Sequence, residues 1–133
     1  MSSIFSKILK GEIPGEIVYE DDNFFAILDI SPVNKGHVLV IPKEEYKDIT
    51  EVPDDLIGDY FNVAKKIGNA FLKMGSDGFN ILMNTKKAAG QVVFHAHIHV
   101  IPRFDGDGLN HWPSKKYDAG EDKIYGEKIR SLL

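Results

Sequence analysis

The segment VVFHAHIHVIP, residues 92–102, constrains the fold of this chain more than any other feature. It places His95, His97 and His99 one residue apart, with apolar residues between and around them. Side chains two residues apart on a β-strand point to the same face. The segment therefore predicts a strand with three histidines on one face, about 7 Å between neighbours. The opposite face is apolar, which predicts packing under a helix. It consists of Phe94, Ala96, Ile98 and Val100.

Four further strands and one long helix are predicted from hydrophobic periodicity. The strands are expected at 16–20, 24–30, 37–42 and 79–84. The helix is expected at 53–74, followed by Gly75 as a C-cap, because its apolar residues recur with a period near 3.6. This stripe consists of Ile57, Tyr60, Phe61, Ala64, Ile67, Phe71 and Met74. The strands do not alternate regularly with helices, so the predicted fold class is α+β with an antiparallel sheet.

The two ends of the chain give further predictions. Ser2 and Ser3 can cap a short N-terminal helix. Pro102 cannot donate a hydrogen bond to a sheet, so it is expected to mark the end of the last strand. Residues 103–120 show no periodic pattern, and a closing helix is expected over 121–133.

Length and composition limit the classes of function. A chain of 133 residues suggests one domain, 1–133, whose tail from about 104 is the least defined part. The net charge of -4 disfavours nucleic acid as a partner. The chain has no cysteine, which excludes disulfides and thiolate metal sites. No segment is apolar enough for a membrane span or a signal peptide, so we expect a cytoplasmic protein without a membrane partner.

Three histidines in strict alternation have three interpretations. They can be structural side chains held by hydrogen bonds. They can bind a metal, because both imidazoles of a His-x-His pair can reach one ion, although few carboxylates lie nearby in the sequence. They can be catalytic, because an imidazole is a neutral nucleophile near pH 7 and can form a covalent bond to phosphorus. The amide donor Gln91, and Gly90, where backbone can approach a phosphate closely, favour catalysis.

The segment GQVVFHAHIHVIP resembles the histidine triad motif, in which three histidines alternate with apolar residues after Gly-Gln. Three further segments resemble the other blocks of the histidine triad family, in the family's order: IFSKILKGEIPGEIVYEDD, AILDISP and GHVLVIPK. The resemblance covers Ile4 to Trp112 and is greatest to the nucleotide-binding branch, the purine nucleoside phosphoramidases. It implies an α+β fold of five antiparallel strands, one long helix and a short N-terminal helix. It also implies a homodimer in which two chains form one continuous sheet.

The resemblance also implies roles for four histidines and one acid. His97 matches the nucleophile that attacks the α-phosphorus, and His95 matches the residue that orients it. His99 matches the residue that contacts the phosphate and helps to protonate the leaving group. His37 matches a fourth histidine beside these three. Asp29 matches the acid that binds both ribose hydroxyls; without the resemblance, it could also be a turn-capping residue before Ser31 and Pro32.

The rest of the implied site is a pocket for a purine nucleotide such as AMP or GMP. Its apolar walls around the base correspond to Phe5, Ile8, Ile27 and Ile30. Its phosphate end corresponds to Asn84, Gly90, Gln91 and Val92. Trp112 matches a tryptophan that the partner chain contributes, although it could instead be a packed surface aromatic.

This chain departs from the family pattern at four positions. Val92 stands where many phosphoramidases have a serine, so a hydroxyl donor is missing while the backbone N–H remains. Many bacterial members bind zinc through a Cys-x-x-Cys pair and two histidines. Here Ser3 and Ser6 occupy the cysteine positions, and Glu45 replaces one histidine. We therefore predict no structural zinc and no cofactor.

Together these features predict a metal-independent hydrolase that cleaves purine nucleoside 5′-phosphoramidates in two steps. His97 displaces the amine, and water then releases the nucleoside monophosphate. One alternative is a dinucleoside polyphosphate hydrolase on the same fold. Another is a nucleotide-binding regulator whose catalysis is vestigial, and a third is a metal-dependent enzyme or metal carrier.

Overall fold

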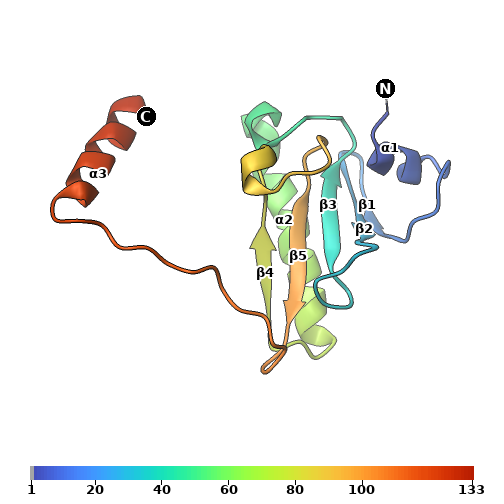
Figure 1. The fold of residues 1–133 in the computed structure, drawn as a ribbon. Helices are drawn as coiled ribbons and strands as arrows, with labels where there is room; N and C mark the ends of the chain where they lie inside the picture. Colours follow the sequence, from blue (N-terminus) through green and yellow to red (C-terminus); the bar gives the residue numbers. More distant parts are fainter. Residues whose placement is uncertain (1) are drawn as a thin grey trace.

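A five-stranded antiparallel sheet forms the centre of the computed structural model, which describes residues 2–133. Its strand order is β1-β2-β3-β5-β4 (Figure 1). The strands are β1 (Ile17–Glu20), β2 (Phe24–Leu28), β3 (Val38–Pro42), β4 (Gly78–Leu82) and β5 (Ile98–Arg103). The α-helices are α1 (Ile4–Leu9), α2 (Asp54–Lys73) and α3 (Glu121–Leu132), with short 3₁₀ turns η1 (Ile49–Glu51) and η2 (Lys87–Ala89). The predicted fold class is confirmed.

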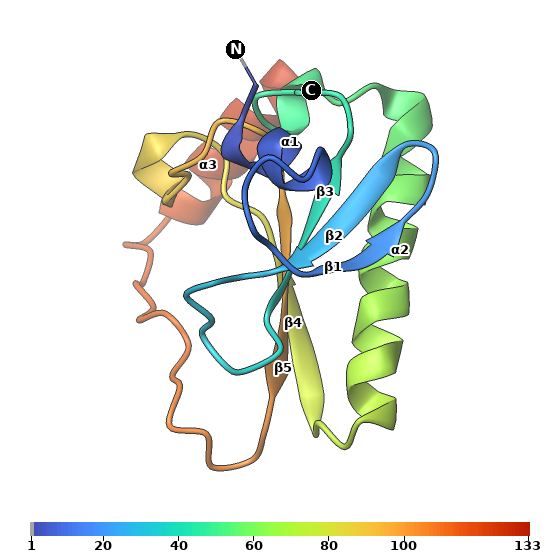
Figure 2. The same ribbon diagram turned by 90° about the vertical axis from the view of Figure 1, so that its right-hand side faces the viewer.

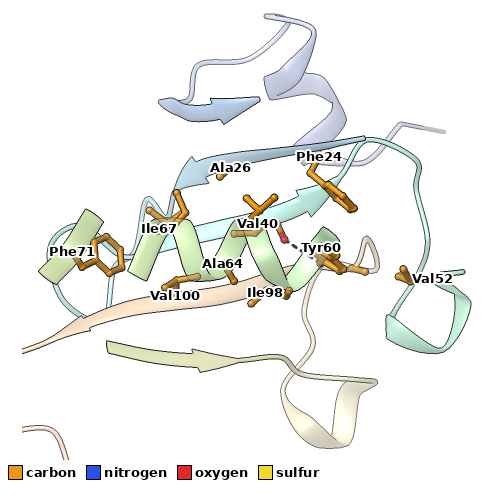
Figure 3. Close-up of a cluster of buried hydrophobic side chains, with 13 residues drawn as sticks. Phe24, Ala26, Val40, Val52, Tyr60, Ala64, Ile67, Phe71, Ile98 and Val100 are labelled. Carbon is orange, nitrogen blue, oxygen red and sulfur yellow. Dashed lines mark hydrogen bonds between the residues drawn. The ribbon is translucent and has the colours of Figure 1, made fainter. Parts of the chain in front are cut away.

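Helix α2 packs along one face of the sheet (Figures 1 and 2). Figure 3 shows the core between them, where alternate side chains of β2, β3 and β5 meet the helix. Tyr60 is fully buried there and donates a hydrogen bond from its hydroxyl to the Val40 carbonyl over 3.1 Å. Three members of the predicted stripe are not buried. Ile57 is partly buried, Phe61 lies at the margin of the stripe, and Met74, at the helix end, is 78% exposed. Within residues 2–133, no helix combines the length and apolar character needed to cross a membrane.

The C-terminus of α2 has a defined cap. Gly75 adopts a left-handed conformation with φ near 102°, which glycine reaches without the steric cost of a Cβ. Its N–H donates to the Leu72 carbonyl, and the Ser76 N–H donates to the Phe71 carbonyl. This pattern is the Schellman motif. It confirms that Gly75 ends the long helix, although the capping position itself is Met74.

Helix α1 lies on the opposite face of the sheet from α2, together with a second apolar cluster. Ser3 caps this helix, because its hydroxyl accepts a hydrogen bond from the Ser6 N–H over 3.1 Å. This confirms the predicted N-terminal helix. The cluster consists of Phe5, Ile8, Phe25, Ile27, Leu39 and Ile41.

Strand β5 starts at Ile98, so the prediction of one strand over 92–102 is wrong in its first half. The register of β3 against β5 would place Pro42 opposite Ala96. Pro42 has no N–H to donate, so the ladder stops there. The Ala96 N–H instead donates to the Tyr46 carbonyl over 2.7 Å.

The apolar face predicted for this segment is therefore also interrupted. Ala96, Ile98 and Val100 are buried under α2 as expected. Phe94 lies outside the strand, where alternation no longer applies, and it is 54% exposed. At the other end, β5 continues through Pro102 to Arg103, because at Pro102 only β4 pairs with the strand.

After β5 the chain forms a C-terminal arm, residues 104–133, which extends away from the sheet and ends in α3 (Figure 1). No residue of α3 is buried. One side of this helix nevertheless carries apolar side chains, including Ile124, Tyr125 and Ile129. A helix with an exposed apolar side is stable mainly when another surface covers that side.

Gly68 marks the tightest contact between α2 and the sheet. A Cβ on Gly68 would lie 2.4 Å from the ring of Phe79, whereas a Cβ on Gly58 of the same helix would meet nothing within 4 Å. We expect Gly68→Ala to lower the free energy of unfolding by about 1–3 kcal/mol through overpacking. Gly58→Ala should raise it by about 0.5–1 kcal/mol through helix propensity. Urea denaturation measures both, and equal effects of the two substitutions would contradict this packing.

Candidate active site

Four of the five histidines gather on the sheet face opposite α2. His37 immediately precedes β3, His99 lies in β5, and His95 and His97 come from the segment before β5. The ring centroids of His97 and His99 are 5.0 Å apart, and those of His37 and His99 are 5.1 Å apart. His37, His95 and His97 are buried. The tertiary structure thus brings together the four histidines that the sequence singled out.

Backbone contacts fix where His97 carries its hydrogen. The Nδ1 atom of His97 lies 2.8 Å from the carbonyl oxygen of His95. A carbonyl oxygen only accepts, so Nδ1 must be the N–H of the neutral ring. The Nε2 atom of His97 therefore carries a free lone pair. This is the form in which an imidazole acts as a nucleophile.

The same argument fixes the tautomers of His37 and His99. The Val33 N–H can only donate, and it does so to His37 Nδ1 over 3.1 Å. Neutral His37 therefore carries its hydrogen on Nε2, which lies 2.9 Å from His99 Nδ1 and donates to it. His99 in turn must carry its own hydrogen on Nε2. His99 presents an N–H donor, whereas His97 presents a lone pair.

Asp29 lies beside this pair, just after β2. Its Oδ1 accepts a hydrogen bond from the Ser31 N–H over 2.8 Å, so the turn-capping interpretation is correct for one oxygen. Its Oδ2 lies 3.7 Å from His37 Nε2. The negative charge of Asp29 favours protonated His37, and burial opposes protonation more strongly.

Burial lowers the pKa of all four histidines of the site. The pKa of His99 falls furthest, to about 4, because desolvation acts together with the neighbouring His97 and His37. For His37, His95 and His97 desolvation is also the largest cause of the lowered pKa. Without a ligand, these rings are therefore neutral at pH 7.

Asp29, His37 and His99 also offer one ligand atom each within 4.8 Å of one another, as a metal site would. Their hydrogen bonds disfavour that use. A metal on His37 Nε2 would have to displace the hydrogen that this nitrogen donates to His99, and His37 Nδ1 is already occupied by the Val33 N–H. His37 and His99 share a hydrogen bond, and Asp29 Oδ2 lies 3.7 Å from His37 Nε2. The prediction of no metal stays a prediction.

The three positions compared with zinc ligands, Ser3, Ser6 and Glu45, meet in space beside His95. His95 Nε2 donates to the Pro42 carbonyl over 2.7 Å, and its Nδ1 lies 2.5 Å from Ser3 Oγ. Glu45 Oε1 accepts hydrogen bonds from the Ser3 N–H and the Ser6 hydroxyl, both over 2.6 Å. Two hydroxyls and a carboxylate are harder ligands than the thiolates that select zinc. The four side chains instead form hydrogen bonds with one another.

The loop before the histidines is held by Gln91, which is buried. The Gln91 Oε1 accepts from the Lys86 N–H over 2.8 Å, and Nε2 donates to the carbonyls of Lys47 and Val93 over 2.6 and 3.1 Å. Both amide hydrogens are thus used within the protein. Gln91 shapes the loop here, rather than offering the free amide donor that the sequence suggested.

The remaining predicted pocket residues are placed unequally. Phe5 lies at the histidines, with its ring edge-on to His97 at 5.1 Å between centroids. Ile30 is 88% exposed in the turn after β2, and Trp112 is 85% exposed on the C-terminal arm. Of the other predicted pocket residues, Ile8 and Ile27 are buried. Asn84, Gly90 and Val92 lie in the loops between β4 and β5. Gly90 adopts a left-handed φ of 99°, and a Cβ there would lie 3.5 Å from the Asn84 amide.

Comparison with known proteins agrees with this geometry. The model of the HIT domain matches residues 10–106, most of the chain. The chain belongs to the HIT family. It is 50% identical over 105 residues to an uncharacterised HIT-like protein of Methanocaldococcus jannaschii, a match covering 79% of this chain and 81% of that protein.

Two other HIT relatives match almost the whole chain. An adenosine 5′-monophosphoramidase of Schizosaccharomyces pombe is 41% identical over 136 residues, covering 100% of this chain and 99% of that protein. A crystal structure of a HIT family member from Bacillus subtilis superimposes with a TM-score of 0.88 at 39% identity. That match covers 100% of this chain and 98% of the other.

Sequence analysis missed one contribution to this HIT site and undervalued another. The Val33 N–H sets the tautomers of His37 and His99, and no side-chain pattern could signal a backbone donor. Ser3 and Glu45 were considered only as positions that lack zinc ligands. The sequence indicates Ser3 as a helix cap, but it does not indicate the contact between Ser3 and His95, which lie 92 positions apart.

The lowered histidine pKa values predict how stability depends on pH. In the unfolded chain each histidine titrates near 6.5, whereas folded His99 titrates near 4. Between these values the unfolded state binds more protons, so the free energy of unfolding falls as the pH drops. We expect urea denaturation to show lower stability at pH 5 than at pH 7.5, with a smaller drop in His99→Asn. Equal drops in the two proteins would contradict the burial of a neutral His99.

Proposed function

We propose that this HIT-family hydrolase cleaves the phosphorus–nitrogen bond of purine nucleoside 5′-phosphoramidates. The observation that carries the proposal is the fixed tautomer of His97, with Nδ1–H held by the His95 carbonyl and Nε2 left bare. A relative that matches the whole chain is named as an adenosine 5′-monophosphoramidase, which supports both the reaction and an adenosine nucleotide as substrate.

In the first step, His97 Nε2 attacks phosphorus and the bond to the amine breaks. The amine must gain a proton as it leaves. The His37–His99 pair is the nearest donor, because its shared hydrogen bond ends at an N–H on His99. Neutral His99 cannot give up a proton without replacement, so the pair must carry an extra one. Binding of the phosphate anion favours this extra proton, since a nearby negative charge raises the pKa of an imidazole.

In the second step, water attacks the nucleotidyl-histidine at phosphorus. The bond to His97 Nε2 breaks, the nucleoside monophosphate leaves, and the proton from water returns to the His37–His99 pair. The ring of His97 ends the cycle in the tautomer in which it began, because its Nδ1–H stays on the His95 carbonyl throughout. No metal or other cofactor enters the balance of either step.

The purine nucleotide is proposed to lie along the histidine face. The free side of the Asp29 carboxylate can accept hydrogen bonds from ribose hydroxyls, since only Oδ1 is used by the Ser31 N–H. Phe5 provides an aromatic wall beside His97. The exposed Ile30 can pack against the base, which would bury an apolar side chain that the free protein leaves in water.

A dinucleoside polyphosphate hydrolase remains the second candidate. The attack on phosphorus is the same, and only the leaving group changes from an amine to a nucleotide. A vestigial regulator is disfavoured, because all four histidines are present and their hydrogen bonds leave a lone pair on His97 and an N–H on His99, which supports the proposed reaction.

We also propose a homodimer joined along β4. Both edge strands of the sheet expose unpaired backbone groups, which a partner strand can satisfy. The pairing of β1 with β2 contains a register shift between Ile17 and Tyr19, whereas the pairing of β4 with β5 is regular. The regular strand is the better template for a continuous sheet. Trp112, exposed on the arm, is proposed to complete the site of the partner.

The whole chain, 1–133, is proposed to act as one domain in the cytoplasm. The absence of cysteine suits a reducing compartment. The C-terminal arm, residues 104–133, would pack as part of this domain if a second chain covered its apolar residues.

The nucleophile is tested with His97→Ala. We expect turnover of adenosine 5′-phosphoramidate, measured with a chelator present, to fall by at least about a thousandfold, because the covalent step is lost. AMP should still bind. His111→Ala is the matched control, since this fifth histidine lies on the exposed arm, and its turnover should equal that of the wild type. Undiminished turnover in His97→Ala would refute the assignment.

Contribution of Trp112 by the partner chain is tested by mixing two impaired proteins, Trp112→Ala and His97→Ala. Trp112→Ala should lower kcat/KM roughly tenfold through loss of an aromatic contact. A mixed dimer of Trp112→Ala and His97→Ala contains one complete site, with His97 from one protomer and Trp112 from the other. We expect the mixture to exceed the summed activity of its parts after subunit exchange. Simple additivity would show that Trp112 serves no partner site.

A further inference from the structure

We infer that Ser3 is a positioning residue for His97, and that Glu45 holds Ser3 in place. The inference deepens the proposed function, because it assigns residues that act on the nucleophile without touching substrate. It starts from the contact of 2.5 Å between Ser3 Oγ and His95 Nδ1, which joins the N-terminus to the histidine segment.

The direction of this hydrogen bond follows from the other contacts. His95 Nε2–H is used by the Pro42 carbonyl, so the Nδ1 of the neutral ring can only accept. The Ser3 hydroxyl receives the Ser6 N–H on one lone pair, and its own hydrogen has two acceptors within reach. His95 Nδ1 at 2.5 Å is much nearer than Ser6 Oγ at 3.4 Å, so the hydrogen goes to His95. Among residues 2–133, the Ser3 hydroxyl is the one group in hydrogen-bonding contact with this nitrogen.

Glu45 fixes the Ser3 backbone from the opposite side. Its Oε1 accepts from the Ser3 N–H and the Ser6 hydroxyl, each over 2.6 Å. The bonds from Ser6 and Ser3 lower the pKa of Glu45, so the carboxylate is charged at neutral pH. Because Glu45 follows β3 closely, it ties the first turn of α1 to the sheet. The carboxylate is exposed, so water weakens its share of the effect.

The chain of contacts reaches His97 through the backbone of His95. With both ring nitrogens held, His95 has little freedom to move, and its carbonyl oxygen stays fixed. That carbonyl holds the hydrogen of His97 on Nδ1. If the His95 ring were released, the hydrogen of His97 could move to Nε2, and the proposed nucleophilic lone pair would be lost. The same helix places Phe5 against His97, so both supports of the His97 ring depend on Ser3.

The test uses Ser3→Gly, which removes the hydroxyl but keeps a residue that is well tolerated at a helix N-cap. We expect kcat for adenosine 5′-phosphoramidate to fall roughly tenfold through misplacement of His97, with KM changed less than about twofold. Ser3→Thr keeps a hydroxyl and should restore kcat. Glu45→Gln should lower kcat by a smaller factor, while the neighbouring Glu44→Gln, which has no contact with Ser3, should match the wild type.

A spectroscopic measurement separates positioning from capping. Nitrogen-15 correlation spectra of the histidine rings report which nitrogen carries hydrogen. The wild type should show Nδ1–H for His97 and Nε2–H for His95, and Ser3→Gly should show a mixture of tautomers at His97. Unchanged tautomers and kcat in Ser3→Gly, with lowered thermal stability, would reduce Ser3 to a helix cap and overturn the inference.

The tautomer spectra also keep this inference distinct from the proposed reaction. If the wild type failed to turn over phosphoramidate while Ser3→Gly still changed the His97 tautomer, the proposed function would fall and the positioning role would stand. If the wild type were active and Ser3→Gly equally active with unchanged spectra, the positioning role alone would fall.

Discussion

The hydrogen bond from His95 Nε2 to the Pro42 carbonyl is the contact on which the site depends. Pro42 ends β3 and has no N–H, so the ladder with β5 cannot extend to the residue opposite. The free carbonyl accepts an imidazole hydrogen instead. The segment before β5 consequently leaves the sheet and buries two histidines that a regular strand would have kept in line with His99.

Backbone groups decide the chemistry of these histidines. Two carbonyls, of Pro42 and His95, and the N–H of Val33 fix the hydrogens on four rings. The result is asymmetric, with a bare nitrogen on His97 and an N–H on His99. Identical side chains thereby differ in whether they present a donor or an acceptor. Burial favours the neutral form of all four rings, and a bound anion would favour their protonation.

Periodicity predicted the parts of the fold that local interactions control. Helix α2, with its stop at Gly75, and all five strands are present near their expected places. The error at the start of β5 came from the partner strand, since Pro42 interrupts a ladder more than fifty residues away in sequence. The predicted burial of Phe94 is wrong for the same reason. Alternation in one segment cannot show where its neighbour stops pairing.

The sequence by itself determined which residue types are available for chemistry. The chain has no cysteine, which excludes thiolate metal chemistry, and four of its five histidines lie in the matched segments together with Asp29, which favours imidazole chemistry. These properties follow from the covalent structure and do not depend on folding. Only the tertiary structure decided which nitrogen of each ring is bare, because that choice depends on donors and acceptors from distant segments. It also gave Ser3 and Glu45 a place beside the histidines, and it turned Gln91 inward to hold the loop. Hydrogen bonds act over about 3 Å, so they arise only where folding has already brought the partners together.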